Sequence, residues 1–353
     1  MYLLKYSMLK KNFFLIEDFE NIDEKEYRNR TFASHFFHSI EWMNIVKQSL
    51  NVKYKIAILK ENDKIVASIP FANFFNFIKG NCALPLHFSG YYGSIVADNL
   101  KQKQKILIHF LNHCKKEKKY TQVPEILPIE GHQSFLGYSI YKIKLDVKQS
   151  AEEQVFKVAS KRMSNYIKLA IKSNLKCVKG GLKFIDKFYF LYLQNMKEVG
   201  SPPLPKIFFE NILECIPNKS KIILIEDNGK VCSGMFLLKV SESELFAPTI
   251  CTPRLYQSSQ SSQLIYLEAI KEAKKLGCSS MNFGRSINDS GPALFKKRYG
   301  LKAIPLLIFT QTENWSLINP KNSIFLKILV SVWKKLPISI IKILGKFFSK
   351  HLI

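Results

Sequence analysis

The stretch Asn282–Gly300, NFGRSINDSGPALFKKRYG, holds three glycines, a proline and five charged residues in one short segment. Gly284 follows an apolar run and permits a sharp change of direction, because glycine readily adopts positive φ. The residues 288–291, Asn-Asp-Ser-Gly, have the composition of a turn. Pro292 is favoured at the first position of a helix. The stretch is therefore predicted to be a strand end, a turn and a helix that closes at Gly300.

Cations stand on both sides of the predicted turn. Arg285 offers a planar guanidinium that suits a carboxylate or a phosphate. Lys296 lies on the predicted short helix, and a fixed cation can stabilise the oxyanion that forms when an amine attacks an ester or thioester. The structural alternative is an internal salt-bridged turn of Gly284, Arg285 and Asp289 that only supports the last strand.

Outward from this stretch, one pattern occurs twice in the chain. The segments Tyr54–Phe71 (YKIAILKENDKIVASIPF) and Ser220–Leu237 (SKIILIEDNGKVCSGMFL) each hold two apolar strands around a polar turn. Asn-Gly in such a place is a strong hairpin signal. An amphipathic helix and a further strand follow each hairpin, within Lys105–Val123 and Gln263–Phe283. The sequence predicts two copies of one α+β unit, the alternative being two unrelated hairpins that are alike by chance.

Composition limits the class of protein. The 353 residues allow two domains and an appendage, and a hydrophobic content of 47% supplies large cores. The net charge of +25 points to nucleic acid, an anionic membrane or a phosphorylated substrate, although a general lysine bias would also produce it. The seven cysteines lack metal-ligand spacing, so no metal is expected. No secretory signal and no run of about 18 apolar residues is evident, which predicts a cytoplasmic protein.

Two further segments are basic. The segment Ala151–Gly181 is predicted to continue as a basic helix, either a solvated face or the lining of a groove for a polyanion. The tail, Leu317–Ile353, has seven lysines and no acid, and Pro337 should divide it into two helices. Its lysines face away from its apolar side chains, as in helices that lie on an anionic leaflet. The alternative is a helical pair docked on the protein itself.

The motif in FGRSINDSGPALFKKRYG resembles the signature of the FemAB-like branch of the acyltransferase superfamily that shares the GNAT fold. Four further segments resemble their counterparts in FemAB-related proteins: FHSIEWMNIV around Trp42, KRMSNYIKLAIKSNL, Phe188–Leu213 and VWKKLPISIIKILG of the tail. The resemblance spans about residues 30 to 345, and the nearest subgroup is the one found beside exosortase and exopolysaccharide genes. Asn282 stands where the family has an acid, which removes an acid-base role at that position.

The resemblance implies an α+β fold of tandem GNAT-like units, here 1–148 and 149–316, followed by the basic tail 317–353. It implies that Lys296 contacts the acyl donor or the reacting carbonyl and that Phe295 sets its position. Arg285 and Asp289 would bind substrate. The family also uses a cation shortly after the N-terminal tryptophan, for which Lys47, after Trp42, is the candidate. Trp42 and Lys47 are therefore candidate substrate-binding residues.

The donor site departs from the usual pattern. Acyl-CoA-binding folds of this strand order hold pyrophosphate with a glycine-rich turn before a helix. The corresponding segment here, RLYQSSQSSQ (Arg254–Gln263), has no glycine, and Ser258, Ser259 and Ser261 are the candidate donor-binding residues. No long helical arm like that of some tRNA-using relatives is evident, which favours a small donor.

The expected activity is transfer of an acyl, acetyl or aminoacyl group to an amine or hydroxyl of a cell-envelope glycan or peptidoglycan-type precursor. The donor substrate would be acyl-CoA or aminoacyl-tRNA, with no bound cofactor. The expected partners are the glycan or its lipid-linked precursor, an anionic membrane at the inner face of the cell membrane, and tRNA. One alternative is an aminoacyl-tRNA-dependent peptidoglycan aminoacyltransferase. The other is a non-catalytic GNAT relic that binds nucleic acid or membrane.

Overall fold

The computed structural model describes residues 12–28, 35–76, 79–90, 95–129, 132, 134–311 and 324–351. The chain divides into two compact units, each of which mixes helices and strands. Unit 1 is Met1–Met43, Val52–Ser134 and Ile308–Glu313, and unit 2 is Asn44–Asn51, Phe135–Leu307 and Asn314–Ile353. The predicted α+β class with mixed sheets is confirmed. The domain boundaries 1–148, 149–316 and 317–353 stay a prediction.

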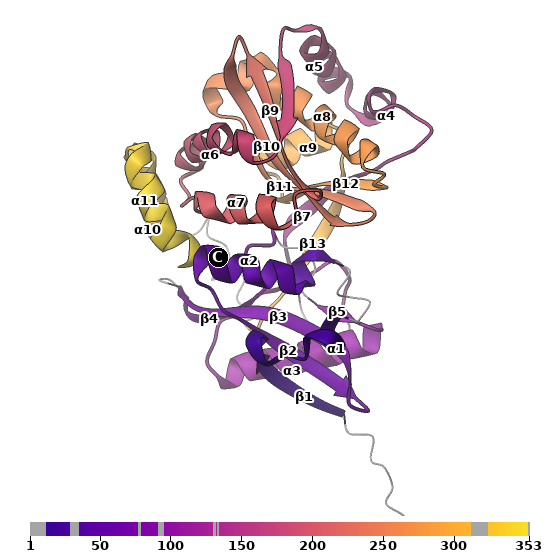
Figure 1. Cartoon of the computed structure of the whole chain (residues 1–353), viewed down its shortest axis with the longest axis vertical. Coiled ribbons are helices and arrows are strands. Elements are labelled where there is room, and N and C mark those ends of the chain that lie inside the picture. Colours follow the sequence, from indigo (N-terminus) through magenta and orange to yellow (C-terminus); the bar gives the residue numbers. More distant parts are fainter. Residues whose placement is uncertain are drawn as a thin grey trace, which may run out of the picture. The chain divides into compact units, whose positions relative to one another are not determined.

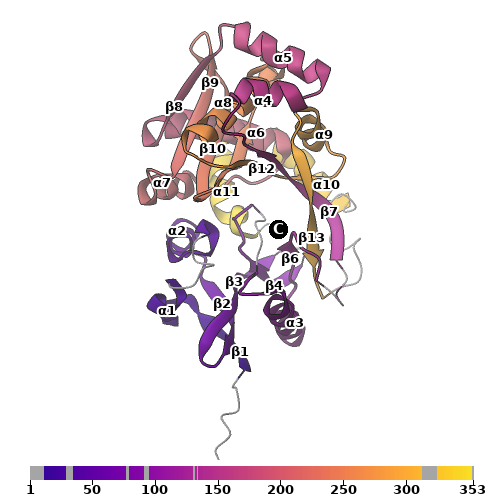
Figure 2. The same ribbon diagram turned by 90° about the vertical axis from the view of Figure 1, so that its right-hand side faces the viewer.

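Unit 1 is built on a sheet of order β1-β2-β3-β4, in which β5 also pairs with β3. Helix α3 packs on this sheet (Figure 2), and the ring of its Phe110 lies 5.0 Å from that of Phe71 on β3. Its elements are β1 (Asn12–Asp18), η1 (Phe19–Asn21), α1 (Glu24–Arg28), η3 (Phe36–His38), β2 (Tyr54–Glu61), β3 (Lys64–Asn76), β4 (Gly80–Pro85), β5 (Val96–Ala97), α3 (Leu100–Lys116) and β6 (Val123–Glu125). Helix α2 (Ile40–Leu50) begins in unit 1 and ends in unit 2.

Unit 2 contains a larger sheet, in the order β13-β7-β12-β11-β10-β9-β8. Its strands are β7 (Ser134–Lys144), β8 (Lys176–Gly180), β9 (Ser220–Asp227), β10 (Lys230–Ser241), β11 (Glu244–Cys251), β12 (Ser280–Ile287) and β13 (Lys302–Phe309). The first residue of β7 and the last two of β13 belong to unit 1. Its helices are α4 (Ala151–Val158), α5 (Lys161–Lys172), η4 (Leu182–Phe184), α6 (Ile185–Val199), α7 (Lys206–Cys215), η5 (Arg254–Ser259), α8 (Ser261–Lys275), α9 (Gly291–Arg298), α10 (Ile324–Lys335), α11 (Ile338–Phe348) and η8 (Ser349–His351).

Both predicted hairpins are present. Glu61 pairs with Lys64 at the end of β2/β3, and Asp227 pairs with Lys230 at the end of β9/β10. The two turn residues of each hairpin have positive φ, as mirror-image turns require; they are Asn62, Asp63, Asn228 and Gly229. The helix that follows each hairpin is also present, as α3 and α8. The same supersecondary pattern therefore occurs once in each unit.

Alternating side chains of β10 bury both faces of the sheet in unit 2. Phe236 points to one face, where its ring lies 5.8 Å from Phe188 of α6 and 5.3 Å from Phe209 of α7. Met235 and Leu237 point to the other face and join the core beneath α8. Figure 1 shows α6 and α7 on one side of these strands and α8 on the other. Successive strand residues face opposite sides, so one strand serves both layers.

The basic segment after β7 differs from its prediction. The expected single helix up to Gly180 is two helices, α4 and α5, followed by strand β8. The Ser160 hydroxyl accepts the N–H of Met163 and starts α5 as a separate helix. After α5, Cys177 and Val178 pair with β9 and extend the sheet.

The described part of the tail, 324–351, consists of α10 and α11, which are divided at Pro337 as predicted. Both helices contact α6 (Figure 1). Ile341 and Gly345 of α11 are buried. The tail therefore docks on unit 2, the alternative considered above. Among the described helices, none is long and apolar enough to cross a membrane.

Replacing Gly345 with Ala is expected to loosen α11 from unit 2. A Cβ at this position would lie 2.6 Å from the carbonyl oxygen of Pro203, and backbone cannot yield as a flexible side chain can. Hydrogen exchange of α11 amides should accelerate at least tenfold, the equivalent of about 1.4 kcal/mol of lost docking free energy. Ile343→Ala, on the exposed side of the same helix, is the control and should leave exchange unchanged. Equal exchange in the two variants would contradict this packing.

Candidate active site

The site is centred where the parallel strands β11 and β12 separate. Their pairing runs from Glu244 opposite Ser280 to Phe246 opposite Asn282. Beyond Asn282 the pairing of β12 with β7 is also shifted, up to Arg285. Gly284, within this irregularity, has φ of +70°, a conformation that other L-residues rarely adopt. The β12 backbone therefore turns here, and consecutive carbonyl groups are available to a side-chain donor.

Lys296 of α9 is that donor. Its Nζ atom lies 2.6 Å from the carbonyl oxygen of Phe283, 3.2 Å from that of Gly284 and 3.4 Å from that of Arg285. The side chain is 5% exposed, and Nζ also lies 5.4 Å from the centre of the Tyr141 ring. The lysine thus joins α9 to the irregular part of β12.

Burial lowers the pKa of Lys296 to about 7. Three carbonyl acceptors favour the ammonium form, because that form has three N–H groups to donate. The longest of the three contacts, to Arg285, is the one that an incoming oxyanion could replace. The position of the ammonium is fixed before any substrate arrives, which is the arrangement that electrostatic catalysis needs.

An aromatic cluster fixes α9. The ring of Phe295 lies 5.1 Å from Tyr266 of α8, and Tyr266 stacks on Phe283 of β12 at 4.4 Å. Tyr299 lies 5.2 Å from Tyr266 and donates its hydroxyl to the carbonyl oxygen of Gln263. Phe295 is half-buried in this cluster. Its ring therefore packs the helix that carries Lys296.

Arg285 and Asp289 lie at the edge of the site. The Arg285 guanidinium stacks over the ring of Tyr138 at 4.8 Å. Asp289 has φ of +59° in the turn before α9, and its carboxylate lies 3.7 Å from Nζ of Lys297. That ion pair is exposed, so it contributes little to stability.

The buried carboxylate of Glu244, which the sequence analysis did not single out, supports β12 through Asn282. Asn282 is fully buried; its Nδ2 donates to Oε1 of Glu244 at 3.0 Å, and its Oδ1 accepts the N–H of Gly284 at 2.9 Å. Glu244 also pairs with Lys142 of β7 at 2.6 Å. The buried carboxylate in this place therefore comes from the neighbouring strand β11. Asn282 uses both ends of its amide to hold the irregular backbone.

The three candidate donor serines differ in their surroundings. Ser261 is buried, and its hydroxyl lies 2.8 Å from that of Ser233 and 3.0 Å from that of Ser259. The Ser259 hydroxyl also donates to the carbonyl oxygen of Tyr256 at 2.7 Å. Ser258 is exposed. The hydroxyls of Ser259 and Ser261 thus hold η5 and α8 together, and donor binding by all three serines stays a prediction.

Trp42 and Lys47 lie on α2. The Trp42 ring is buried, 4.8 Å from Phe37 and 5.6 Å from Phe36, both edge-on. Lys47 is half-buried in the last turn of the helix. Trp42 therefore serves the core of unit 1, and substrate binding by these two residues stays a prediction.

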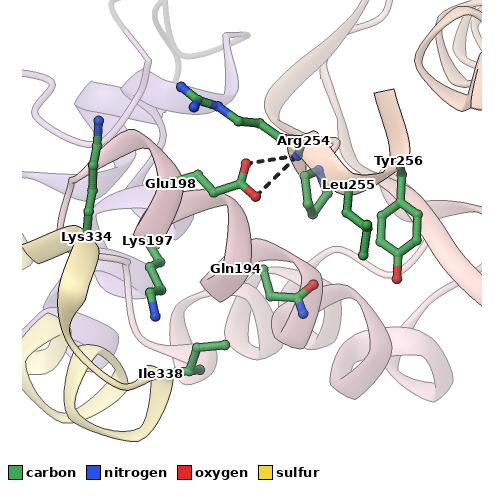
Figure 3. A pocket seen from close by; sticks show the side chains of 9 residues that line it. Gln194, Lys197, Glu198, Arg254, Leu255, Tyr256, Lys334 and Ile338 are labelled. Carbon is green, nitrogen blue, oxygen red and sulfur yellow. Dashed lines mark hydrogen bonds between the residues drawn. The ribbon is translucent and has the colours of Figure 1, made fainter. Parts of the chain in front are cut away.

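A separate pocket lies in unit 2 between the end of α6, η5 and the tail helices. Its volume is about 400 Å³. Figure 3 shows the Glu198 carboxylate within it, turned to the backbone N–H of Arg254. Its lining residues are Gln194, Lys197, Glu198, Pro253, Arg254, Leu255, Tyr256, Lys334 and Ile338. Sequence reasoning did not find it, because it depends on the docked tail.

Comparison with known proteins places the fold. No family model and no curated protein matches the chain. Among solved structures, FemX has a TM-score of 0.58 at 10% identity, over 81% of this chain and 94% of that one. L-PGS from Bacillus licheniformis has a TM-score of 0.50 at 12% identity, over 77% and 87%. A tandem GNAT protein from the clavulanic acid biosynthesis pathway has a TM-score of 0.50 at 8% identity, over 84% and 98%. The chain has the fold of FemX and of a tandem GNAT protein, which confirms the resemblance at the level of fold.

Proposed function

We propose that the protein is a FemAB-like acyltransferase that acts on an amine or hydroxyl of a cell-envelope glycan or peptidoglycan-type precursor. The observation that carries this proposal is Lys296, a buried cation fixed where β11 and β12 separate. The sequence motif that resembles the FemAB-like signature includes this same residue. A fold of this kind hosts several activities, so the proposal is based on the site and not on the fold alone.

The chemistry follows from a fixed cation. The acceptor nitrogen or oxygen attacks the acyl carbon, its new bond to carbon forms, and the carbonyl oxygen becomes an oxyanion. The ammonium of Lys296 stabilises that negative charge. The oxyanion then collapses, and the bond between the acyl carbon and the sulfur of CoA or the ribose oxygen of tRNA breaks. The proton that the acceptor loses goes to the leaving group, so the transfer balances without an oxidant.

Both donors remain candidates under this proposal. The net charge of +25 suits tRNA as well as the phosphates of CoA. Native mass spectrometry and calorimetry against acetyl-CoA, longer acyl-CoAs and charged tRNA would separate them. Binding and turnover of an acyl-CoA is the expected result. Salt-sensitive binding and turnover of charged tRNA alone would favour the peptidoglycan aminoacyltransferase instead.

One observation favours a non-catalytic protein. All three N–H groups of the Lys296 ammonium have acceptors within the protein, so this lysine would serve as a structural clamp. Binding and turnover of neither donor would support that second candidate, a GNAT relic that binds nucleic acid or membrane through its net charge. For either candidate we place the protein at the inner face of the cell membrane.

A further inference from the structure

The pocket beside the tail carries cations from three separate elements of unit 2. Lys197 comes from α6, Arg254 from η5 and Lys334 from α10. In Figure 3 the side chains of Arg254 and Lys334 extend to the same side of Glu198, and that of Lys197 extends to the other. Gln194 adds an amide to the lining. A pocket of about 400 Å³ is of the size that holds a small ligand or a head group.

The charges in this pocket favour an anion. Its one carboxylate, that of Glu198, accepts the backbone N–H of Arg254 through both oxygens, at 3.0 and 3.2 Å. This carboxylate and the negative end of α6 oppose an anion. Arg254 and Lys334, which extend to the same side, outnumber this carboxylate, and both arginine and lysine bind phosphate. The ligand class that fits is therefore a phosphate or pyrophosphate group.

Exposed apolar side chains lie on the elements around the pocket. Leu255, which lines it, is 79% exposed, and Val199 at the end of α6 is 58% exposed. The tail helices expose further large apolar side chains, namely Ile328, Leu329, Val332, Ile340, Ile343, Phe347 and Phe348. Monomeric proteins rarely leave such residues together in water without a partner.

The tail helices also carry lysines beside these apolar residues. Residues 324–351 include Lys327, Lys334, Lys335, Lys342, Lys346 and Lys350, and they include no Asp or Glu. An apolar surface with lysines and without acids complements an anionic lipid leaflet. A docked helix pair that buries Ile341 against the protein can thus still present its other side chains to lipid.

We propose that this pocket binds the phosphate or pyrophosphate head group of a lipid, while the tail helices contact the anionic leaflet that contains it. Lys334 and Ile338 make the tail part of the binding site, because both line the pocket. The inference concerns binding and is independent of Lys296. It adds to the proposed function a site at which a lipid-linked acceptor would be held.

Two neighbouring lysines provide a matched test. Lys334 lines the pocket, whereas Lys335, which is exposed on the same helix, is not among its lining residues. Full-length wild type, Lys334→Glu and Lys335→Glu would be compared in sedimentation with phosphatidylcholine vesicles, with and without phosphatidylglycerol. Calorimetry with inorganic pyrophosphate would be run in parallel, and thermal melts would show that both variants are folded.

The pocket predicts unequal effects of the same charge change. Lys334→Glu should weaken binding to phosphatidylglycerol vesicles and to pyrophosphate by about tenfold, whereas Lys335→Glu should change vesicle binding only a few-fold and leave pyrophosphate binding unchanged. Equal losses in both variants without pyrophosphate binding would overturn the pocket and leave only general attraction to the leaflet. Lys334-dependent pyrophosphate binding without vesicle binding would overturn the lipid source, since the phosphate would then belong to a soluble molecule.

Discussion

Lys296→Met is expected to reduce the transfer rate by about a hundred- to a thousandfold, the usual effect of removing one group that stabilises an oxyanion. Methionine fills a similar volume and carries no charge, so the variant removes the cation with little change in packing. Single-turnover rates with the donor identified by calorimetry would measure the loss. Lys302→Met, which changes an exposed lysine on β13, is the control and should keep the wild-type rate. Wild-type turnover in folded Lys296→Met would exclude the proposed role.

The effect of Lys296→Met on the free energy of unfolding is expected to depend on pH. The folded pKa of Lys296 is about 7, below its ordinary value of 10.5. Between these values the unfolded chain binds a proton that the folded chain has released. The unfolding free energy of the wild type, relative to Lys296→Met, should therefore rise with pH across this window, by up to about 5 kcal/mol. A constant difference in denaturant titrations would mean that the three carbonyls keep the ammonium charged throughout.

The elements that the sequence predicted well are those determined by local contacts. Asn228 and Gly229 set the turn of the second hairpin through their own φ angles, and neighbouring strands then pair in register. The helix α9 likewise begins at its own signals, because Ser290 accepts the N–H of Ala293 and Pro292 stands in its first turn. Such features depend on residues that are close in sequence, which makes them predictable from the sequence alone.

The parts that could not be predicted depend on contacts between distant segments. Glu244 supports Asn282 from a neighbouring strand, and Lys142 reaches Glu244 from another. The alternation of apolar and polar residues shows which side chains of a strand share a face of the sheet. It does not show which strands pair with one another. The sequence of the tail did not distinguish a docked helix pair from a membrane-bound one, because both have one apolar side and one basic side. The contacts of α10 and α11 with α6, and the burial of Gly345 and Ile341, show that the pair is docked.

Gly300→Ala is expected to destabilise unit 2 by about 2–5 kcal/mol. Gly300 closes α9 with φ of +89°, where an added Cβ costs about 1–2 kcal/mol through backbone strain. That Cβ would also lie 2.5 Å from Cγ2 of Val158 and 2.7 Å from its backbone carbonyl, and overpacking of this kind costs about 1–3 kcal/mol. Equilibrium unfolding in urea would measure the change.

The control for this substitution lies at the other end of the same helix. A Cβ on Gly291 would contact nothing within 4 Å, so Gly291→Ala should change stability by less than about 0.5 kcal/mol. The carbonyl of Arg298 accepts the N–H of Ser160, so the end of α9 is also tied to the segment between α4 and α5. Movement of Gly300 away from Val158 would therefore displace the helix that carries Lys296, and transfer activity should fall together with stability. Equal stability of the two alanine variants would show that α4 can move aside, and the position of Lys296 would then not depend on this contact.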